Sequence, residues 1–287
     1  MAGLSYLRGV ASLMRPYSIG NIALISILTI AYMTVIKFDY KFLITVLAGL
    51  LFWIVCVFLL EFLHKKVDGR EEYINHYIFI VSILVLLVIL AFMAPIGILI
   101  LILSLISVKL YGMKVKDSII SELAFLFRPF TEIGIVYMTA AIYGYNLLAF
   151  KLIYLSGLIY LISISRNIIG DIRDMNHDKY TLVRTTIGKN GGYLLSLAFL
   201  VILAIANGIN YALIPLVFVG ILILLRLDAY ALHKIYVVCS SFYFAFLLLV
   251  SQVNSALIIF LLFVSVALSF TYNLTPRKSN ISKPEWI

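Results

Sequence analysis

Long apolar segments separated by short polar ones run along the whole chain of 287 residues. Each segment approaches the length of about 20 residues that a helix needs to cross a bilayer. Residues typical of tight turns, such as Pro95 and Asn254, separate several neighbouring segments. The predicted spans lie near 18–36, 42–63, 77–92, 94–112, 129–145, 148–166, 191–207, 211–226, 234–250 and 254–272. The pattern therefore predicts an all-α, polytopic transmembrane bundle with ten candidate helices.

The composition excludes a soluble globular protein. The chain is 64% hydrophobic and 12% charged, whereas soluble domains are about 45–50% apolar and about 25% charged. A membrane β-barrel would show short alternating segments instead of continuous apolar runs. Cys56 and Cys239 lie inside apolar segments without CxxC spacing, so we expect buried thiols rather than a disulfide or metal site.

Basic residues are distributed unevenly between the two sides of the predicted bundle. Of 22 Lys and Arg residues, nineteen lie near the termini or in loops after even-numbered spans. The other three are Lys37, Lys41 and Lys151. Because cytoplasmic loops are enriched in Lys and Arg, this split predicts a multi-pass protein of the cell membrane with a cytoplasmic N-terminus. Topology thus explains the net charge of +9 without a nucleic-acid partner.

Three aspartates lie close together after the sixth predicted span, in "GDIRDMNHDK" (170–179). Asp171, Asp174 and Asp178 have i, i+3, i+7 spacing, which places their carboxylates on one face of a helix. Like charges on one face repel, and a divalent cation among them would relieve that repulsion. Mg²⁺ prefers oxygen ligands and often bridges to phosphate oxygens. With Arg173 and Lys179 interleaved, the segment predicts a cytoplasmic Mg²⁺–diphosphate site, the alternative being a solvated loop whose charges pair among themselves.

A weaker segment of the same kind, "EFLHKKVD" (61–68), follows the second predicted span on the same side. Glu61, His64 and Asp68 repeat the i, i+3, i+7 spacing. Two such clusters at corresponding places in a bundle can face each other across a cavity. We therefore expect a diphosphate and its metal to lie between them.

Single charged residues in the fifth predicted span are further candidates. Glu132 is an ionisable group at membrane depth, which is a functional candidate by default and could line a polar cavity. Glu122 and Arg128 lie nearer the cytoplasmic end, and we expect them to pair with each other.

"DIRDMNHDK" followed by "VRTTIG" resembles the second aspartate-rich motif of the UbiA-type intramembrane prenyltransferases. Arg15–Pro16 before the first span is similar to that superfamily, as is "SELAFLFRPFTEIGIVYM" (121–138). The first motif of the family, NDxxDxxxD, corresponds here to "LEFLHKKVD", with Leu60 in place of Asn and His64 in place of an Asp. The second motif is therefore intact and the first is degenerate.

The resemblance implies a single domain over residues 1–287 with nine helices, so the expectation is a bundle of nine to ten. It implies transfer of a prenyl group from a polyprenyl diphosphate to a lipid-soluble or lipid-like acceptor, either a quinone precursor or a glycerol-phosphate lipid. It also implies Mg²⁺ as cofactor. The residues predicted at the catalytic and metal site are Asp171, Asp174, Asp178, Glu61 and Asp68, with His64 as a further metal ligand. Those predicted to contact diphosphate are Lys65, Arg173, Lys179, Arg184 and Arg15.

Two other functions remain open at this stage. Leu60 and His64 favour a non-catalytic descendant that binds lipid or acts as a scaffold after losing its first metal site. A secondary transporter would place carboxylates at the membrane midplane on broken helices. The two acidic clusters instead follow the ends of predicted spans on one side, which makes a transporter the weakest alternative.

Overall fold

The computed structural model describes residues 16–68, 76–113, 119–176, 178, 180–208, 210–250 and 255–270. Within these ranges the regular structure is entirely helical. The α-helices are α2 (Pro16–Met33), α3 (Tyr40–Asp68), α4 (His76–Met93), α5 (Ile96–Gly112), α6 (Ile119–Glu122), α7 (Phe130–Tyr143), α8 (Phe150–Arg173), α9 (Gly188–Asn207), α10 (Ile214–Leu224), α11 (Ala229–Val250) and α12 (Ser255–Ser269). Short helical turns are η3 (Ala124–Leu126), η4 (Val183–Ile187) and η5 (Tyr211–Leu213).

The all-α prediction is confirmed, and each of the ten predicted spans coincides with one helix. The four-residue α6 is an additional element in the part of the chain described. Five helical segments are long and apolar enough to cross a membrane on length and composition: Tyr40–Leu63, Ala124–Tyr143, Phe150–Arg173, Val183–Asn207 and Ala229–Val250. These segments indicate a multi-pass membrane protein. The number of crossings, the single domain and the orientation of the termini stay predictions.

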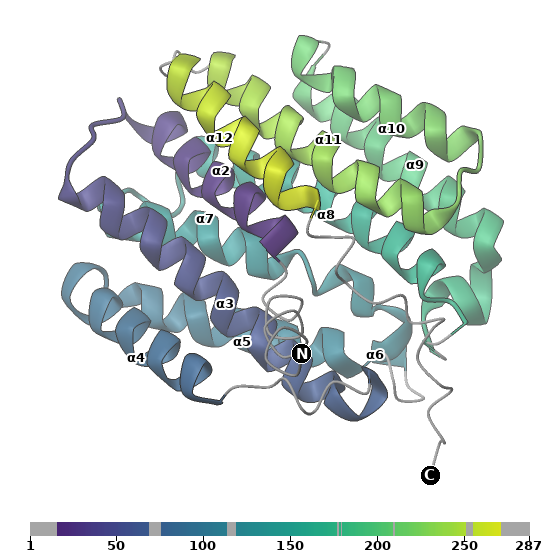
Figure 1. Ribbon diagram of the computed structural model, residues 1–287, viewed down its shortest axis with the longest axis horizontal. Coiled ribbons are helices and arrows are strands. Elements are labelled where there is room, and N and C mark those ends of the chain that lie inside the picture. The colour runs from purple at the N-terminus through teal and green to yellow at the C-terminus, as the bar shows by residue number, and fades with distance from the viewer. Residues whose placement is uncertain are drawn as a thin grey trace, which may run out of the picture.

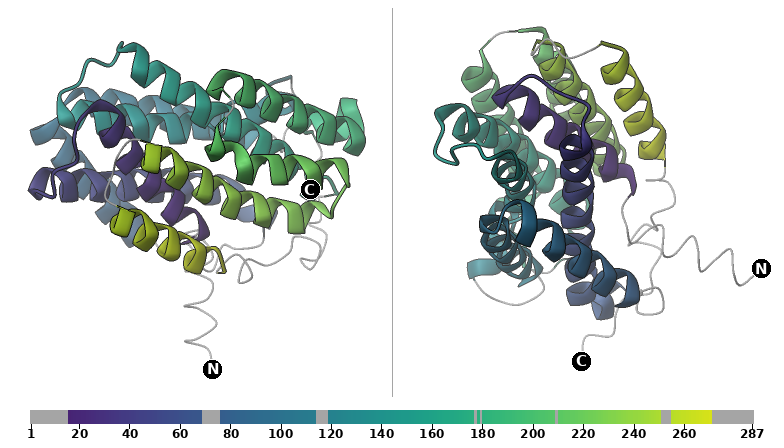
Figure 2. Two further views of the ribbon diagram at one scale, coloured as in Figure 1. Left: turned by 90° about the horizontal axis from the view of Figure 1, so that it is seen from above. Right: turned by 90° about the vertical axis from the view of Figure 1, so that its left-hand side faces the viewer.

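The helices lie side by side along one direction (Figure 1). In that view α3, α4 and α5 form one edge and α10, α11 and α12 form the opposite edge, with α2, α7 and α8 between them. Helix α2 contacts α3, α7, α8, α11 and α12, and Figure 2 shows it enclosed among them. Its side chains Ile22, Leu24 and Leu28 are completely buried. The core of the bundle therefore surrounds α2.

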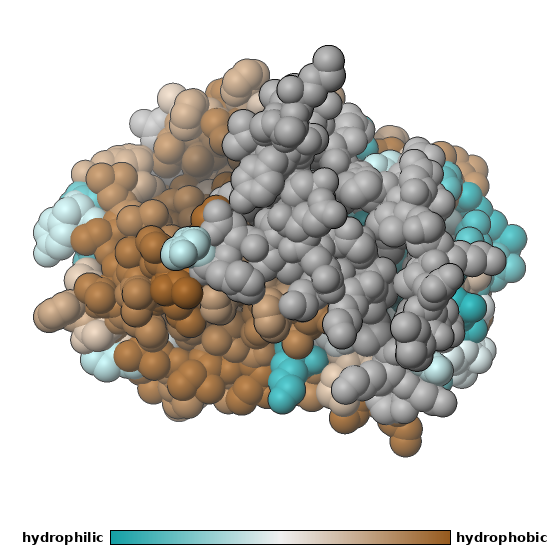
Figure 3. All heavy atoms as spheres, turned by 60° about the horizontal axis from the view of Figure 1, so that its bottom comes forward, coloured by the Kyte–Doolittle hydropathy of each residue, from teal (hydrophilic) through white to brown (hydrophobic). Residues whose placement is uncertain are grey.

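Large apolar side chains cover the outside of the bundle. On α4, Tyr77 and Val81 are exposed, and on α5 so are Leu99 and Leu103. Figure 3 shows a broad hydrophobic surface on the face in view, with hydrophilic residues gathered toward its margins. An exposed apolar surface of this extent is far larger than the patches found on soluble monomers, so the surrounding solvent is expected to be lipid.

Two helices extend beyond the apolar runs that predict them, and the extension of α8 positions part of the candidate site. Helix α3 continues to Asp68, past the predicted end at residue 63, and α8 continues to Arg173, past the predicted end at residue 166. The apolar run of α8 stops at its first charged residue, whereas the helix continues because the bundle encloses the residues that follow, Asn167 to Ile172. Asp171 thus lies in the last turn of α8.

Small residues let the central helices approach closely, as is common in membrane bundles. At Gly20 of α2, an added Cβ would lie 2.2 Å from Ser265 Oγ and 2.5 Å from Ser265 Cα on α12. At Gly134 of α7, it would lie 2.3 Å from Ser104 Oγ on α5. Both contacts are closer than van der Waals distance, so these positions require glycine.

Replacing Gly20 by alanine is expected to lower stability by about 1–3 kcal/mol, the usual cost of overpacking a core. The measurement is the thermal unfolding of the purified protein in detergent. Gly157→Ala is the matched control, because Gly157 lies in α8 with no neighbouring atom within 4 Å of the added methyl group. Equal midpoints for Gly20→Ala and Gly157→Ala would contradict the close packing of α2 against α12.

Candidate functional site

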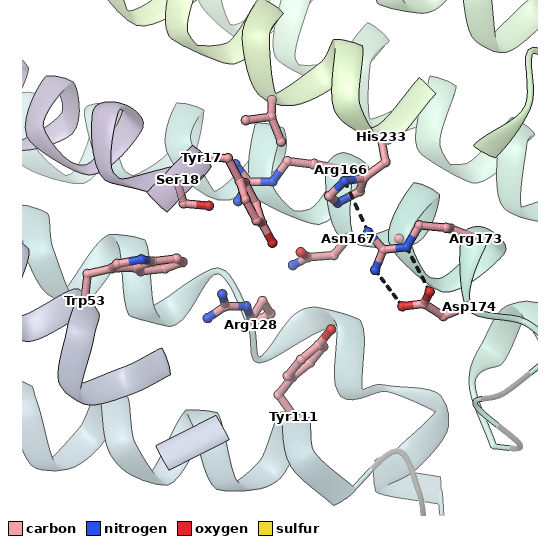
Figure 4. A pocket seen from close by; sticks show the side chains of 12 residues that line it. Tyr17, Ser18, Trp53, Tyr111, Arg128, Arg166, Asn167, Arg173, Asp174 and His233 are labelled. Carbon is pink, nitrogen blue, oxygen red and sulfur yellow. Dashed lines mark hydrogen bonds and ion pairs between the residues drawn. The ribbon is translucent and has the colours of Figure 1, made fainter. Parts of the chain in front are cut away.

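A cavity of about 50 Å³ lies at one end of the bundle, where α5 and α8 end and α2, α7 and α11 begin. Its lining comes from α2, α3, α5, α8, α11 and the turn before α7. The lining residues are Tyr17, Ser18, Trp53, Tyr111, Arg128, Arg166, Asn167, Gly170, Arg173, Asp174, His233 and Val237. We call this cavity the basic pocket, because three arginines line it (Figure 4).

The end of α8 differs from the arrangement that the aspartate spacing predicts. Helix α8 ends at Arg173, Asp174 caps it with φ −94° and ψ 6°, and Asp178 lies four residues further on. The Asp178 N–H donates to the Asp174 carbonyl at 2.9 Å, which continues the turn outside the helix. The three aspartates therefore do not share one helical face. Like charges on successive turns destabilise a helix, which is consistent with its ending here.

All three aspartates of the second motif are nonetheless buried. Asp171 is 3% exposed, Asp174 is 6% exposed and Asp178 is 1% exposed. This burial argues against the alternative of a solvated loop. Asp174 lines the basic pocket, whereas Asp171 and Asp178 are not among its lining residues.

Arg173 and Asp174 form a two-pronged ion pair at the edge of the pocket. Arg173 Nε lies 2.8 Å from Asp174 Oδ1, and Nη2 lies 2.6 Å from Oδ2. Arg173 Nη1 is also 3.4 Å from His233 Nδ1 of α11. Figure 4 shows this group at one side of the cavity. The sequence assigned Asp174 to metal and Arg173 to diphosphate, and the structure places both at one site, paired with each other.

A second ion pair, Arg166 with Glu132, joins α8 to α7 inside the bundle. Arg166 is 8% exposed and Glu132 is 3% exposed. Arg166 Nη2 also lies 3.4 Å from Ser163 Oγ. Burial of either charge alone would be strongly unfavourable, so each stabilises the other. Glu132, singled out by its membrane depth, is thus the counter-charge of a pocket arginine.

The third arginine, Arg128, is held by aromatic rings. Its Cζ lies 4.7 Å from the ring centroid of Trp53 on α3 and 5.8 Å from that of Tyr111 on α5. Its Nη1 donates to Thr131 Oγ1 at 3.3 Å. Such contacts with aromatic faces attract the cation and fix its position.

The pairing of Glu122 with Arg128 is not the arrangement that the structure shows. Glu122 Oε1 accepts hydrogen bonds from Thr185 Oγ1 at 2.7 Å and from Thr186 Oγ1 at 3.4 Å. Glu122 thereby ties the segment before α7 to the η4 turn, while Arg128 points into the pocket.

Asn167 is a pocket residue that the sequence reasoning missed. It is 9% exposed, and its Nδ2 has no hydrogen-bond partner among the described residues. Figure 4 shows its amide directed into the cavity, toward the hydroxyl groups of Tyr17 and Tyr111. The available signal was the polar run Ser163, Ser165, Arg166 and Asn167 within and just after an apolar span.

The remaining predicted site residues are only partly located. Glu61 is buried, and Leu60 beside it is 1% exposed within the apolar core. Arg184 is exposed, and its Nη1 donates to the Met175 carbonyl at 2.9 Å. Arg15 and Lys179, together with the side chains of His64, Lys65 and Asp68, lie outside the described residues.

The described part of the chain contains no group of three or more His, Cys, Asp or Glu side chains that could hold a metal ion. The predicted meeting of the two acidic clusters around Mg²⁺ therefore stays a prediction. The aromatic residue Trp53 brings α3 to the pocket, so both helices that carry the clusters contribute to the same cavity.

A solved structure described as digeranylgeranylglyceryl phosphate synthase in membranes has a similar fold. The TM-score is 0.52 with 14% sequence identity, and the match covers 98% of this chain and 100% of that one. No protein-family profile and no curated protein matches the chain. The likeness establishes a shared helical architecture over nearly the whole chain.

Replacing Glu132 by glutamine should destabilise the fold by roughly 3 kcal/mol, because Arg166 then keeps a buried charge without its counter-charge. The measurement is thermal unfolding in detergent. Glu122→Gln, at a half-buried acid bonded only to hydroxyl groups in the described structure, is the matched control and should shift the midpoint little. The double variant Glu132→Gln, Arg166→Met should recover part of the loss. Additive losses in the double variant would contradict the pairing.

Proposed function

We propose that the protein transfers a prenyl group from a polyprenyl diphosphate to a lipid-like acceptor within the membrane. The observation that carries the proposal is a buried pocket lined by three arginines at the end of an apolar helix bundle. The likeness to digeranylgeranylglyceryl phosphate synthase supports it. So does the resemblance of the second aspartate-rich segment to that of UbiA-type enzymes.

The chemistry requires a leaving group to be stabilised away from water. The bond between the allylic carbon and the diphosphate oxygen breaks, and its electron pair leaves with the diphosphate. Arg128, Arg166 and Arg173 would neutralise that developing negative charge through charge-assisted hydrogen bonds. A nucleophilic atom of the acceptor then supplies the electron pair of the new bond and loses its proton.

The rings of Tyr17, Trp53 and Tyr111 line the same cavity. Aromatic faces attract cations, so these rings suit an allylic carbon that carries positive charge. The cavity is far smaller than the roughly 300–1,000 Å³ of a site that encloses a whole drug-sized ligand. It therefore suits the diphosphate end of the donor, with the prenyl chain extending toward lipid.

The donor set of the second motif fits Mg²⁺ by its chemistry. Asp171, Asp174 and Asp178 are buried carboxylates, and carboxylate oxygens are the ligands that Mg²⁺ prefers. These three would hold the ion together with Glu61, Asp68 and His64 of the first motif. When bound, Mg²⁺ would add positive charge beside the diphosphate.

The acceptor falls in one of two classes, a quinone precursor or a glycerol-phosphate lipid. The name of the structurally similar synthase makes the glycerol-phosphate lipid the first to test. In the proposed orientation the pocket would lie on the cytoplasmic side of the membrane. The polar glycerol-phosphate group of the acceptor would be accessible there.

One observation favours the second candidate function, a lipid-binding or scaffold protein without catalysis. Leu60, which stands where the family has a polar Asn, is packed in the apolar core. In that case the pocket would bind a prenyl diphosphate or phospholipid headgroup without turnover.

The decisive assay incubates the purified protein with labelled geranylgeranyl diphosphate, Mg²⁺ and acceptors of both classes. We expect a labelled lipid product, and Asp174→Asn should lower its rate about a hundredfold, the usual effect of losing one group that supports transition-state charge. Asp39→Asn is the matched control. Asp39 Oδ1 accepts from the Phe42 N–H at 2.9 Å, and asparagine preserves that cap.

Product formation by Asp174→Asn at the wild-type rate would contradict the placement of the site. No product with any acceptor, together with retained binding of the prenyl diphosphate, would favour the non-catalytic candidate.

A further inference from the structure

We infer that Trp53 and Asn167 form a neutral subsite of the basic pocket, which binds a hydroxyl group of the prenyl acceptor. The inference names the chemistry of the acceptor, an uncharged alcohol or phenol, and therefore rests on the proposed function. It concerns binding and makes no claim about turnover.

Two buried N–H donors in the wall of one cavity carry the inference. Trp53 is 1% exposed and Asn167 is 9% exposed, and both line the pocket. Neither Trp53 Nε1 nor Asn167 Nδ2 has a hydrogen-bond partner among the described residues. Buried donors are almost always satisfied by protein, water or a ligand. An oxygen atom inside the cavity is therefore expected to accept from them.

The contact between Trp53 and Arg128 leaves the indole N–H available. The Arg128 Cζ lies 4.7 Å from the centroid of the Trp53 ring, and a cation over an aromatic ring contacts its face. The indole N–H lies in the plane of the ring and can only donate. Trp53 thus offers one donor from α3, and Asn167 offers one from α8.

The two donors lie away from the charged group at the end of α8. Figure 4 shows Trp53 and Ser18 on one side of the cavity and the Arg173–Asp174 pair on the other. The Asn167 amide points into the cavity, away from Arg173. Diphosphate oxygens are charged and suit a guanidinium such as that of Arg173. The opposite side is therefore left for an uncharged part of the acceptor.

A hydroxyl group matches the hydrogen-bonding capacity of this side. Its oxygen accepts from an N–H, and its proton can be donated to the hydroxyl oxygen of Ser18, a buried residue that lines the same cavity. A hydroxyl group is about the size of a water molecule, which needs roughly 10–15 Å³. It would occupy only part of the cavity of about 50 Å³. A hydrocarbon group would leave both donors unpaired, so acceptors without a hydroxyl are disfavoured.

The Trp53 indole is itself the reporter for the test. The chain contains two tryptophans, Trp53 and Trp286, so Trp286→Phe leaves a single indole signal. The test records the proton–nitrogen NMR correlation of this indole in lipid nanodiscs while 1-O-octylglycerol is added. This probe is uncharged and carries the hydroxyl groups of glycerol. We expect a saturable shift of the indole proton as the hydrogen bond forms, in a protein whose pocket is unaltered.

Matched probes separate the hydroxyl group from the rest of the ligand. Octyl propyl ether has the same skeleton without hydroxyl groups and should cause no shift at the concentration at which octylglycerol saturates. The phenol 1-naphthol represents the acceptors of the quinone-precursor class. A shift with octylglycerol alone would identify a glycerol acceptor, a shift with naphthol alone would identify a phenolic one, and a shift with both would identify an unselective hydroxyl subsite.

Variants test the two donors one at a time, with binding of octylglycerol measured by calorimetry. Asn167→Leu removes the amide and keeps the side-chain size, and it should weaken binding about fivefold to tenfold, the loss expected of one buried hydrogen bond. Trp53→Phe keeps an aromatic ring and should weaken binding by a similar factor. Asn207→Leu is the matched control. Asn207 Nδ2 is likewise buried without a partner among the described residues, but Asn207 does not line the pocket.

The inference is overturned if octylglycerol and 1-naphthol both leave the Trp53 signal unchanged, or if the ether shifts it equally. It is also overturned if folded Asn167→Leu and Trp53→Phe bind octylglycerol as tightly as wild type. Displacement of octylglycerol by an equal concentration of inorganic diphosphate in EDTA would assign the donors to the diphosphate instead. Binding as expected without any prenyl transfer would refute the proposed function and leave the subsite intact. Prenyl transfer without any response of Trp53 would do the reverse.

Discussion

The ion pair between Arg166 and Glu132 allows a polar site to exist inside an apolar bundle. Both groups are buried, and each would be strongly unfavourable alone in such surroundings. Their pairing ties α8 to α7 close to the end of the bundle. Helix α8 can therefore continue past its apolar run and carry Asn167, Arg173 and Asp174 to the basic pocket.

The close helix contacts serve the same arrangement. Helix α9 packs against α8 at Gly192, where an added Cβ would lie 2.9 Å from Ile172 Cγ1. Helix α11 also contacts α8 and places His233 Nδ1 3.4 Å from Arg173 Nη1. Because α8 is held from α7, α9 and α11, its last turns are fixed although they contain charged residues. The part of the pocket that α8 contributes is thus positioned by helix packing.

Much of the fold was readable in the sequence because membrane helices have a simple signal. Ten apolar runs predicted the ten longer helices, and the charged ends of two of them predicted where polar chemistry gathers. The exact form of the aspartate cluster was not readable, because spacing assumes a helix that in fact ends at Arg173. The partners of Arg128 and Arg166 were also not readable. Trp53, Tyr111 and Glu132 lie on helices other than those next to their partners in the sequence reading. Residue spacing along one helix does not show which faces of different helices contact each other.

The structure gives several residues contacts that differ from those expected from the sequence. Glu132 was notable in the sequence for its depth, and the structure gives it a specific partner in Arg166. Arg128 was expected to pair with Glu122, which instead bonds to Thr185 and Thr186. The Arg128 guanidinium lies against the rings of Trp53 and Tyr111. Asn167 was not predicted as a site residue, yet its buried amide is directed into the cavity. The pocket therefore combines residues of the recognised segment with residues outside it.

The central claim is that the basic pocket binds the diphosphate end of a prenyl donor. The most direct test is an experimental structure of the protein with a non-hydrolysable geranylgeranyl thiolodiphosphate. The account predicts phosphate density between Arg128 and Arg173, with the prenyl chain leading out toward lipid. Phosphate density elsewhere on the protein, with the pocket unchanged, would contradict it.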